Sequence, residues 1–293
     1  MLGCLALVLL PFLTSCAARL GQFSQFAATG QTYAVALPAV LDVALQSTID
    51  ANSSELIAGR DNIRDRKERA DELGKSDDEI RRRARAFQAI KTQTHLLGAY
   101  FTGIAALAES DAGAGLGKST ADAADALARI SQDAAALQIG TASVKDALGE
   151  GVPIVVAAFK HARLEAVLKG TAESVGRSLD IHIALLDRLG EVIRGEQEVA
   201  IRNTKLVEID RKYTEDGALP KRWKERRAEL LLQEARLGEL EEALQAAQKL
   251  KLAFVALVEN QKPTASLTLL LQDVQRLISL AERISGESPG EGG

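Results

Sequence analysis

The sequence predicts an all-α protein, an elongated antiparallel bundle of about six helices with coiled-coil hairpin arms. Roughly three residues in ten are Ala or Leu, which favour helices, whereas only 4% are aromatic. Apolar residues recur at spacings of three and four, and never with the alternation of a strand. With 46% hydrophobic residues, the chain can bury a large core and is neither a disordered tail nor a collagen.

Prolines and capping residues divide the chain into six helical segments. The first runs from about Gln31 to Leu73. The second begins at the capping box Ser76–Glu79, whose acidic residues suit a helix N-terminus. The remaining four begin near Ser119, Pro153, Pro220 and Pro263.

Each segment carries an apolar seam that one face of a helix would bury. The seam of the fourth segment is the longest, and steps of seven continue it into a charged region. Its members are Val175, Leu179, His182, Leu186, Leu189, Ile193, Val199, Leu206 and Tyr213. Sustained spacing of this kind predicts knobs-into-holes packing between neighbouring helices.

The bundle is expected to form one domain, residues 31–286, followed by a disordered tail, residues 287–293. Two stretches, residues 60–86 and 194–245, are far more charged than the rest of the chain. A helix that is polar nearly all round cannot be buried. These stretches are therefore expected to extend past the core as solvated hairpin arms.

The first fifteen residues predict an export signal. Met1–Ser15 carries no charged side chain, and its apolar run Leu5–Leu13 is too short to cross a bilayer as a helix. The run has the length of a signal-peptide h-region, although no Lys or Arg precedes it. An ordinary cleaved signal and a buried apolar N-terminus are the alternatives to the more specific interpretation that follows.

Leu13-Thr14-Ser15-Cys16 resembles the lipobox of bacterial lipoproteins, an aliphatic residue and two small residues before a Cys. The resemblance implies that the Cys16 thiol is joined to diacylglycerol, that signal peptidase II cuts before Cys16, and that the new amine is acylated. Acyl chains at Cys16 would anchor the protein stably in a lipid bilayer. The implied location is the bacterial cell envelope: the outer membrane, favoured by Ala17, or the cell membrane in a monoderm. Residues 16–30 are then expected to form a lipidated tether.

No metal site, cofactor site or catalytic centre is expected. Under the lipoprotein interpretation Cys4 leaves with the signal and Cys16 carries lipid, which excludes a disulfide. His161 and Glu165 share a helix face, but a metal site in a bundle needs a second such pair, which the sequence lacks. The sequence has no nucleophile elbow, so we do not expect an enzyme. His182 lies on a seam, where it would face a ligand held between helices.

Residues 112–119, Ala-Gly-Ala-Gly-Leu-Gly-Lys-Ser, satisfy a relaxed phosphate-loop pattern. A phosphate loop follows a strand, whereas a helical pattern precedes these residues. We therefore expect a loop between helices that ends in the N-cap Ser119, and no nucleotide binding.

Two basic clusters lie in the charged stretches, Arg81–Arg85 and Lys221–Arg227. The second contains the only Trp and so combines cationic with amphipathic aromatic side chains, which suits a protein partner or an anionic surface. Nucleic acid is not expected, because the net charge is −4. The candidate contact residues are Lys221, Arg222, Trp223, Lys224, Arg226 and Arg227.

The leading functional hypothesis is a non-catalytic, lipid-anchored envelope lipoprotein whose helical arms bind a protein partner. One alternative is a membrane-active protein resembling helical pore-forming toxins, with Val152–Phe159 or Leu252–Val258 as the inserting segment. Another alternative is a bundle that binds a small ligand between its helices, near His182.

Overall fold

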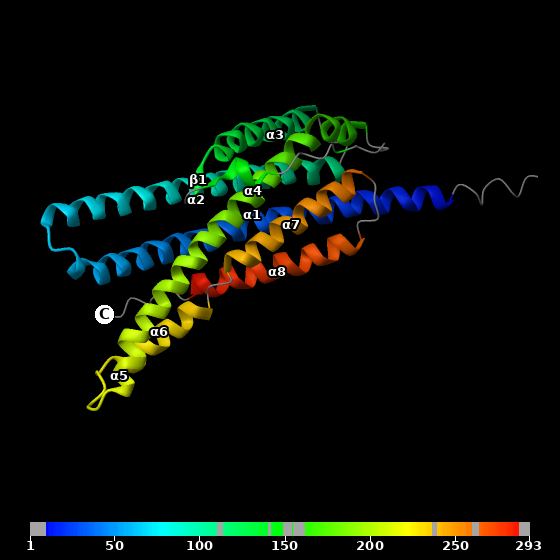
Figure 1. Cartoon of the computed structure of the whole chain (residues 1–293). Coiled ribbons are helices and arrows are strands. Elements are labelled where there is room, and N and C mark those ends of the chain that lie inside the picture. The colour runs from blue at the N-terminus through cyan, green and yellow to red at the C-terminus, as the bar shows by residue number, and fades with distance from the viewer. Residues whose placement is uncertain are drawn as a thin grey trace, which may run out of the picture.

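The computed structural model describes residues 10–109, 114–139, 142–148, 154, 162–235, 239–259 and 264–286. It confirms the all-α prediction: long helices form an elongated bundle from which two hairpins project (Figure 1). The helices are α1 (Leu10–Gly59), α2 (Arg66–Glu109), α3 (Ala114–Ala135), α4 (Ala162–Thr204), α5 (Arg211–Thr214), α6 (Trp223–Ala235), α7 (Glu239–Val258) and α8 (Thr264–Gly286). The short elements are the 3₁₀ turns η1 (Arg60–Asn62) and η2 (Val144–Ala147), the π-helical η3 (Lys205–Asp210), and the paired antiparallel strands β1 (Gln138–Ile139) and β2 (Ala142–Ser143).

The core follows the long axis of the bundle. α1 packs against α2, α7 and α8, while α4 packs against α3 and α7. Near the start of α1, the ring of Phe26 meets Phe101 edge-on, with ring centroids 5.2 Å apart, and stacks on Phe254 at 6.1 Å. These three rings come from α1, α2 and α7, so they fix how the three helices meet.

The expected tether is helical and partly buried. α1 begins at Leu10 rather than near Gln31, and it includes all of residues 16–30. Phe23, Phe26 and Ala27 are buried in the core, so the later half of this stretch belongs to the bundle. The physical reason is that these residues extend the seam of Tyr33 and Leu37 backwards at helical spacing.

The predicted start of the second helix was wrong. α1 ends at Gly59 and α2 begins at Arg66, ten residues before Ser76. Asp65 caps α2, because its Oδ1 accepts hydrogen bonds from the backbone N–H groups of Lys67 and Glu68 at 2.7 and 3.0 Å. Ser76 lies inside the helix, where its hydroxyl donates to Asn52 Oδ1 at 2.6 Å and joins α2 to α1.

The glycine-rich residues before Ser119 are helical from Ala114 onward. Ser119 therefore does not cap the helix, and its hydroxyl instead donates to the carbonyl of Leu116 at 3.0 Å. No strand precedes this segment among the described residues, in keeping with the expectation that the pattern is not a phosphate loop.

The seam of α4 is confirmed in its first part and wrong beyond residue 193. All six of its members from Val175 to Ile193 are buried, whereas Val199, Leu206 and Tyr213 are exposed. Ile201 and Ile209 are buried in their place. The change begins within α4, where the helix leaves the bundle, and the π-helical η3, which holds more residues per turn, follows it.

The spacing of apolar residues predicts seams for the fifth and sixth segments, and these are confirmed wherever the structure describes the side chain. Their predicted members are Leu230, Leu237, Leu240, Leu244 and Ala247, then Leu267, Leu270, Val274, Leu277, Ala281 and Ile284. Leu230 of α6, Leu240, Leu244 and Ala247 of α7, and Leu270, Val274, Leu277 and Ala281 of α8 are buried. In Leu252–Val258 most side chains lie in the core, although Leu252 is exposed. Of Val152–Phe159, only Ile154 lies in the described residues, and the tail 287–293 lies outside them.

Candidate functional site

Four polar side chains from four helices form a buried chain of hydrogen bonds. The Tyr33 hydroxyl of α1 lies 2.8 Å from Nε2 of His182 in α4. Nδ1 of His182 lies 3.3 Å from Oε1 of Gln93 in α2, whose Nε2 donates to the Ser131 hydroxyl of α3 at 3.0 Å. Since the Gln93 amide oxygen only accepts, the neutral imidazole carries its proton on Nδ1 and accepts from Tyr33 at Nε2.

His182 is a structural residue at this point and does not face a ligand pocket. Its side chain is fully buried, and both ring nitrogens bond to protein groups. Burial lowers the pKa of His182 to about 3, and it raises the pKa of Tyr33 above its ordinary value. Both groups are therefore neutral near neutral pH and lock four helices in one register.

Metal ligands do not converge in the part of the chain that the structure describes. No group of three or more His, Cys, Asp and Glu side chains lies close enough there to hold a metal ion. His95 is exposed on α2, and His161, half of the predicted two-ligand pair, lies outside the described residues.

The first basic cluster, Arg81–Arg85, is largely occupied by ion pairs. Arg83 is buried and donates from Nη2 to Glu196 of α4 at 2.5 Å and from Nε to Glu79 at 3.0 Å. Arg81 and Arg82 pair with acidic residues one turn earlier on α2. This cluster therefore fastens α2 to α4 and offers little free charge to a partner.

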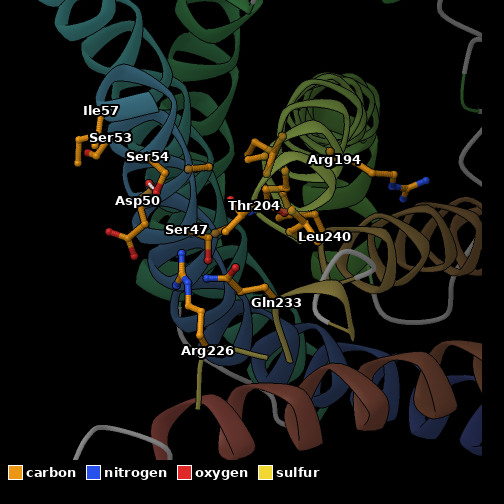
Figure 2. A pocket seen from close by; sticks show the side chains of 17 residues that line it. Ser47, Asp50, Ser53, Ser54, Ile57, Arg194, Thr204, Arg226, Gln233 and Leu240 are labelled. Carbon is orange, nitrogen blue, oxygen red and sulfur yellow. Dashed lines mark hydrogen bonds between the residues drawn. The ribbon is translucent and has the colours of Figure 1, made fainter. Parts of the chain in front are cut away.

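A groove of about 490 Å³ lies between α1 and α4. The groove is lined by α1 from Ala44 to Ile57, by α4 from Gly190 to Thr204, and by Arg226, Gln233 and Leu240. Figure 2 shows Arg226 and Gln233 extending from α6 toward Ser47 and Asp50 of α1, whereas Arg194 points away from them. Sequence reasoning missed this groove, because it depends on how helices far apart in the sequence meet.

The second basic cluster lies at the far end of the second arm, which consists of residues 194–235. Here η3 and α5 extend α4, and α6 returns beside them (Figure 1). The indole of Trp223 stacks on the ring of Tyr213, with centroids 5.5 Å apart, and its N–H donates to the carbonyl of Ile209 at 3.2 Å. Arg226 pairs with Glu208 at 2.6 Å and with Glu229 at 3.0 Å. The end of the arm is thus internally braced.

Four cations at this end remain free. Lys221, Arg222, Lys224 and Arg227 are exposed and have no ion-pair partner among the described residues. Cations outnumber carboxylates between residues 205 and 227. Of the six predicted contact residues, the structure therefore assigns Trp223 and Arg226 to bracing the arm. We call residues 211–227 the basic tip.

Cys16 lies within α1, seven residues before the buried aromatic side chain of Phe23. Within the described residues, one segment is long and apolar enough to cross a membrane by length and composition, residues 21–57 of α1. Tyr33, Leu37, Val40 and Leu41 of this segment are buried against other helices. These four side chains belong to the protein core, whereas Val35 and Ile57 of the same segment are exposed.

The fold and these surfaces define an all-α bundle with two projecting helical arms. Comparison of the chain with protein-family models, with curated proteins and with solved structures finds no match.

Proposed function

We propose that the protein is a non-catalytic lipoprotein of the bacterial envelope, anchored through acylated Cys16, which binds a protein partner through its helical arms. The Leu13–Cys16 lipobox resemblance supports the anchor. The observation that carries the partner site is the basic tip, where four free cations are neighbours in sequence of Trp223, whose ring stacks on Tyr213. Amphipathic aromatic residues and Arg are the side chains that dominate binding energy at protein interfaces.

The anchor is tested by labelling cells with radioactive palmitate. The Cys16→Ala variant is expected to lose the label and to accumulate as uncleaved precursor, because no other thiol receives the lipid. Cys4→Ala is the matched control and is expected to remain labelled and cleaved. Continued labelling of Cys16→Ala would refute the lipoprotein assignment.

The partner site is tested by crosslinking in intact cells from a photoreactive residue at Leu219, followed by identification of the crosslinked protein. Reversing Lys221, Arg222, Lys224 and Arg227 to Glu is expected to abolish one discrete adduct. The control reverses four exposed cations of the other arm, Arg60, Arg64, Arg66 and Lys67, and is expected to retain that adduct. Equal loss in both variants would show that the tip has no specific role.

A small-ligand function remains the second candidate, at the groove rather than at His182. Gln197, Gln233 and Thr204 line the groove and make no side-chain hydrogen bond to the described residues. Unpaired amides and hydroxyls in a concave site suit a neutral ligand with several hydrogen-bonding groups. A shift of melting temperature with a library of such compounds, lost in Gln197→Ala, would favour this function.

A further inference from the structure

The stretch that follows Cys16 leaves almost no room for a flexible linker. α1 is continuous from Leu10 to Gly59, and Phe23 is already buried with 1% of its surface exposed. Seven residues of helix separate Phe23 from Cys16, which is about 10 Å at 1.5 Å per residue. Acyl chains on Cys16 would therefore be held close to the folded core.

The start of α1 is also firmly fixed to the bundle. Phe26 packs between Phe101 and Phe254. At Gly30 the backbone of α1 approaches so closely that an added Cβ would lie 2.5 Å from the ring of Phe101. A flexible hinge within residues 23–30 would break these contacts, so the direction of α1 sets the direction of the whole molecule.

Both arms lie at the opposite end of the molecule from Cys16. α1 and α4 run in the same direction, because Tyr33 meets His182 and, further along both helices, Ala44 and Ile193 line the same groove. The first arm ends near Gly59, which is about 65 Å from Cys16 along α1. The basic tip lies about 45 Å beyond His182 by the same helical rise. Figure 1 shows both hairpin ends on the side away from the start of α1.

We infer that the mature protein is a rigid strut, in which the bundle end at Cys16 rests on the bilayer and the basic tip stands about 60 Å from it, facing an acidic protein surface at that height. The inference rests on the proposed lipidation of Cys16. The partner is assigned as acidic because four exposed cations of the tip, Lys221, Arg222, Lys224 and Arg227, have no ion-pair partner among the described residues. A flexible tether would instead let the tip reach the anionic headgroups of its own membrane.

The only Trp of the chain, Trp223, makes this placement measurable. The chain beginning at Cys16 has one thiol, which can be coupled to a maleimide phospholipid and inserted into vesicles whose acyl chains carry bromine. Bromine quenches indole emission only at close range, whereas the strut holds Trp223 more than a bilayer's thickness away. Emission on brominated vesicles is expected to equal that on unbrominated ones, both for phosphatidylcholine and for phosphatidylcholine mixed with phosphatidylglycerol.

A matched control moves the indole to the other end of the strut. Gly21 has nothing within 4 Å of an added Cβ and lies five residues after Cys16. In the Trp223→Phe background, Gly21→Trp is expected to lose at least half of its emission on brominated vesicles. Quenching of Trp223 on either vesicle type would overturn the strut, and quenching confined to phosphatidylglycerol would show that the tip binds lipid.

The lipid anchor at Cys16 and the rigid strut can be refuted by different results. Coupling in vitro supplies the lipid whatever the cell does, so quenching of Trp223 overturns the strut while palmitate labelling still supports the lipoprotein. A cell that leaves Cys16 unlabelled refutes the anchor, and the strut as a property of the native protein falls with it. In that case the quenching pattern would still measure the rigidity of α1.

Discussion

At the scale of single residues, the chain from Tyr33 to Ser131 shows how a polar group can specify a helical core. Leu, Ile and Ala side chains permit several registers between helices, because one apolar seam resembles another. Four hydrogen-bonding groups that are buried together satisfy one another in only one register. His182 is the centre of this arrangement, since it bonds both to α1 and to α2.

The protonation of His182 links this network to pH. Its pKa is about 3 in the folded protein and about 6.5 in an unfolded chain. Above pH 6.5 the His182 imidazole is neutral in both the folded and the unfolded chain, so its contribution to the free energy of unfolding is constant. Below pH 6.5 the unfolded chain binds a proton that the folded protein excludes, so the free energy of unfolding falls by up to about 1.4 kcal/mol per pH unit until pH 3.

We therefore expect urea denaturation to show a pH dependence that His182→Gln removes. Between pH 7 and pH 5 the native chain should lose about 2 kcal/mol more than the variant, which is itself less stable at pH 7. His95→Gln alters an exposed imidazole and should keep the native slope. Parallel slopes for native and His182→Gln proteins would show that the imidazole is not excluded from protonation.

At the scale of elements, the apolar seams were predictable because the period of 3.6 leaves a direct pattern in the sequence. The seams of α7 and α8 and the first part of the α4 seam follow from that pattern alone. Helix starts were less predictable. Asp65-x-x-Glu68 and Ser76-x-x-Glu79 satisfy the same capping pattern. Their hydrogen bonds distinguish them: Asp65 accepts from two backbone N–H groups, whereas Ser76 donates to Asn52.

Capping energies test this distinction. Asp65→Ala is expected to lower the free energy of unfolding by about 1 kcal/mol, because two backbone N–H groups lose their acceptor. Ser76→Ala should change it by less than about 0.5 kcal/mol, since Ala favours the helix interior and offsets the lost hydrogen bond. Chemical denaturation measures both. A larger loss of stability in Ser76→Ala than in Asp65→Ala would instead indicate that the helix starts at Ser76.

The buried part of residues 16–30 was predictable, because Phe23, Phe26 and Ala27 continue the seam of Tyr33 and Leu37, but the close approach of α1 to α2 was not. Gly30 carries the reason: it lacks a side chain where the ring of Phe101 approaches. Of the buried polar network, the sequence indicated only His182, since a single Gln or Ser on a seam gives no signal of its own. The groove and the bracing of the basic tip gave no signal in the sequence, because both arise from how separate helices meet.

Two glycines in helices should respond oppositely to the same substitution. Gly30→Ala places a Cβ against Phe101, which cannot retreat because Phe26 and Tyr100 contact it, so a loss of about 1–3 kcal/mol is expected. Gly195→Ala of α4 meets nothing within 4 Å and should gain about 0.5–1 kcal/mol from reduced backbone entropy. Calorimetric melting of both variants decides this. A stable Gly30→Ala would mean that α1 and α2 are further apart.

At the scale of the whole molecule, apolar and charged parts are separated along the long axis. The buried aromatic contacts gather near the start of α1, whereas the four unpaired cations Lys221, Arg222, Lys224 and Arg227 lie on the basic tip. The second arm contributes little to the core: of its apolar side chains, Ile201, Ile209 and Leu230 are buried, whereas Leu206, Val207, Leu231 and Leu232 are exposed. Exposed apolar side chains on the second arm suit a binding surface rather than a part of the stabilising core.

The separation predicts that the arm can be removed without unfolding the bundle. Replacing residues 205–229 with a four-residue Gly/Ser turn joins α4 to α6 where the two helices already run side by side. The removed part packs mainly on itself, so the melting temperature should fall by no more than about 4 °C, the shift typical of 1–2 kcal/mol in a chain of this size. Because the deletion removes the photoreactive position 219, binding is measured by co-purification, and the variant should no longer co-purify with the partner that the crosslink identified. A collapse of the helical circular dichroism signal at much lower temperature would instead show that the arm stabilises the core.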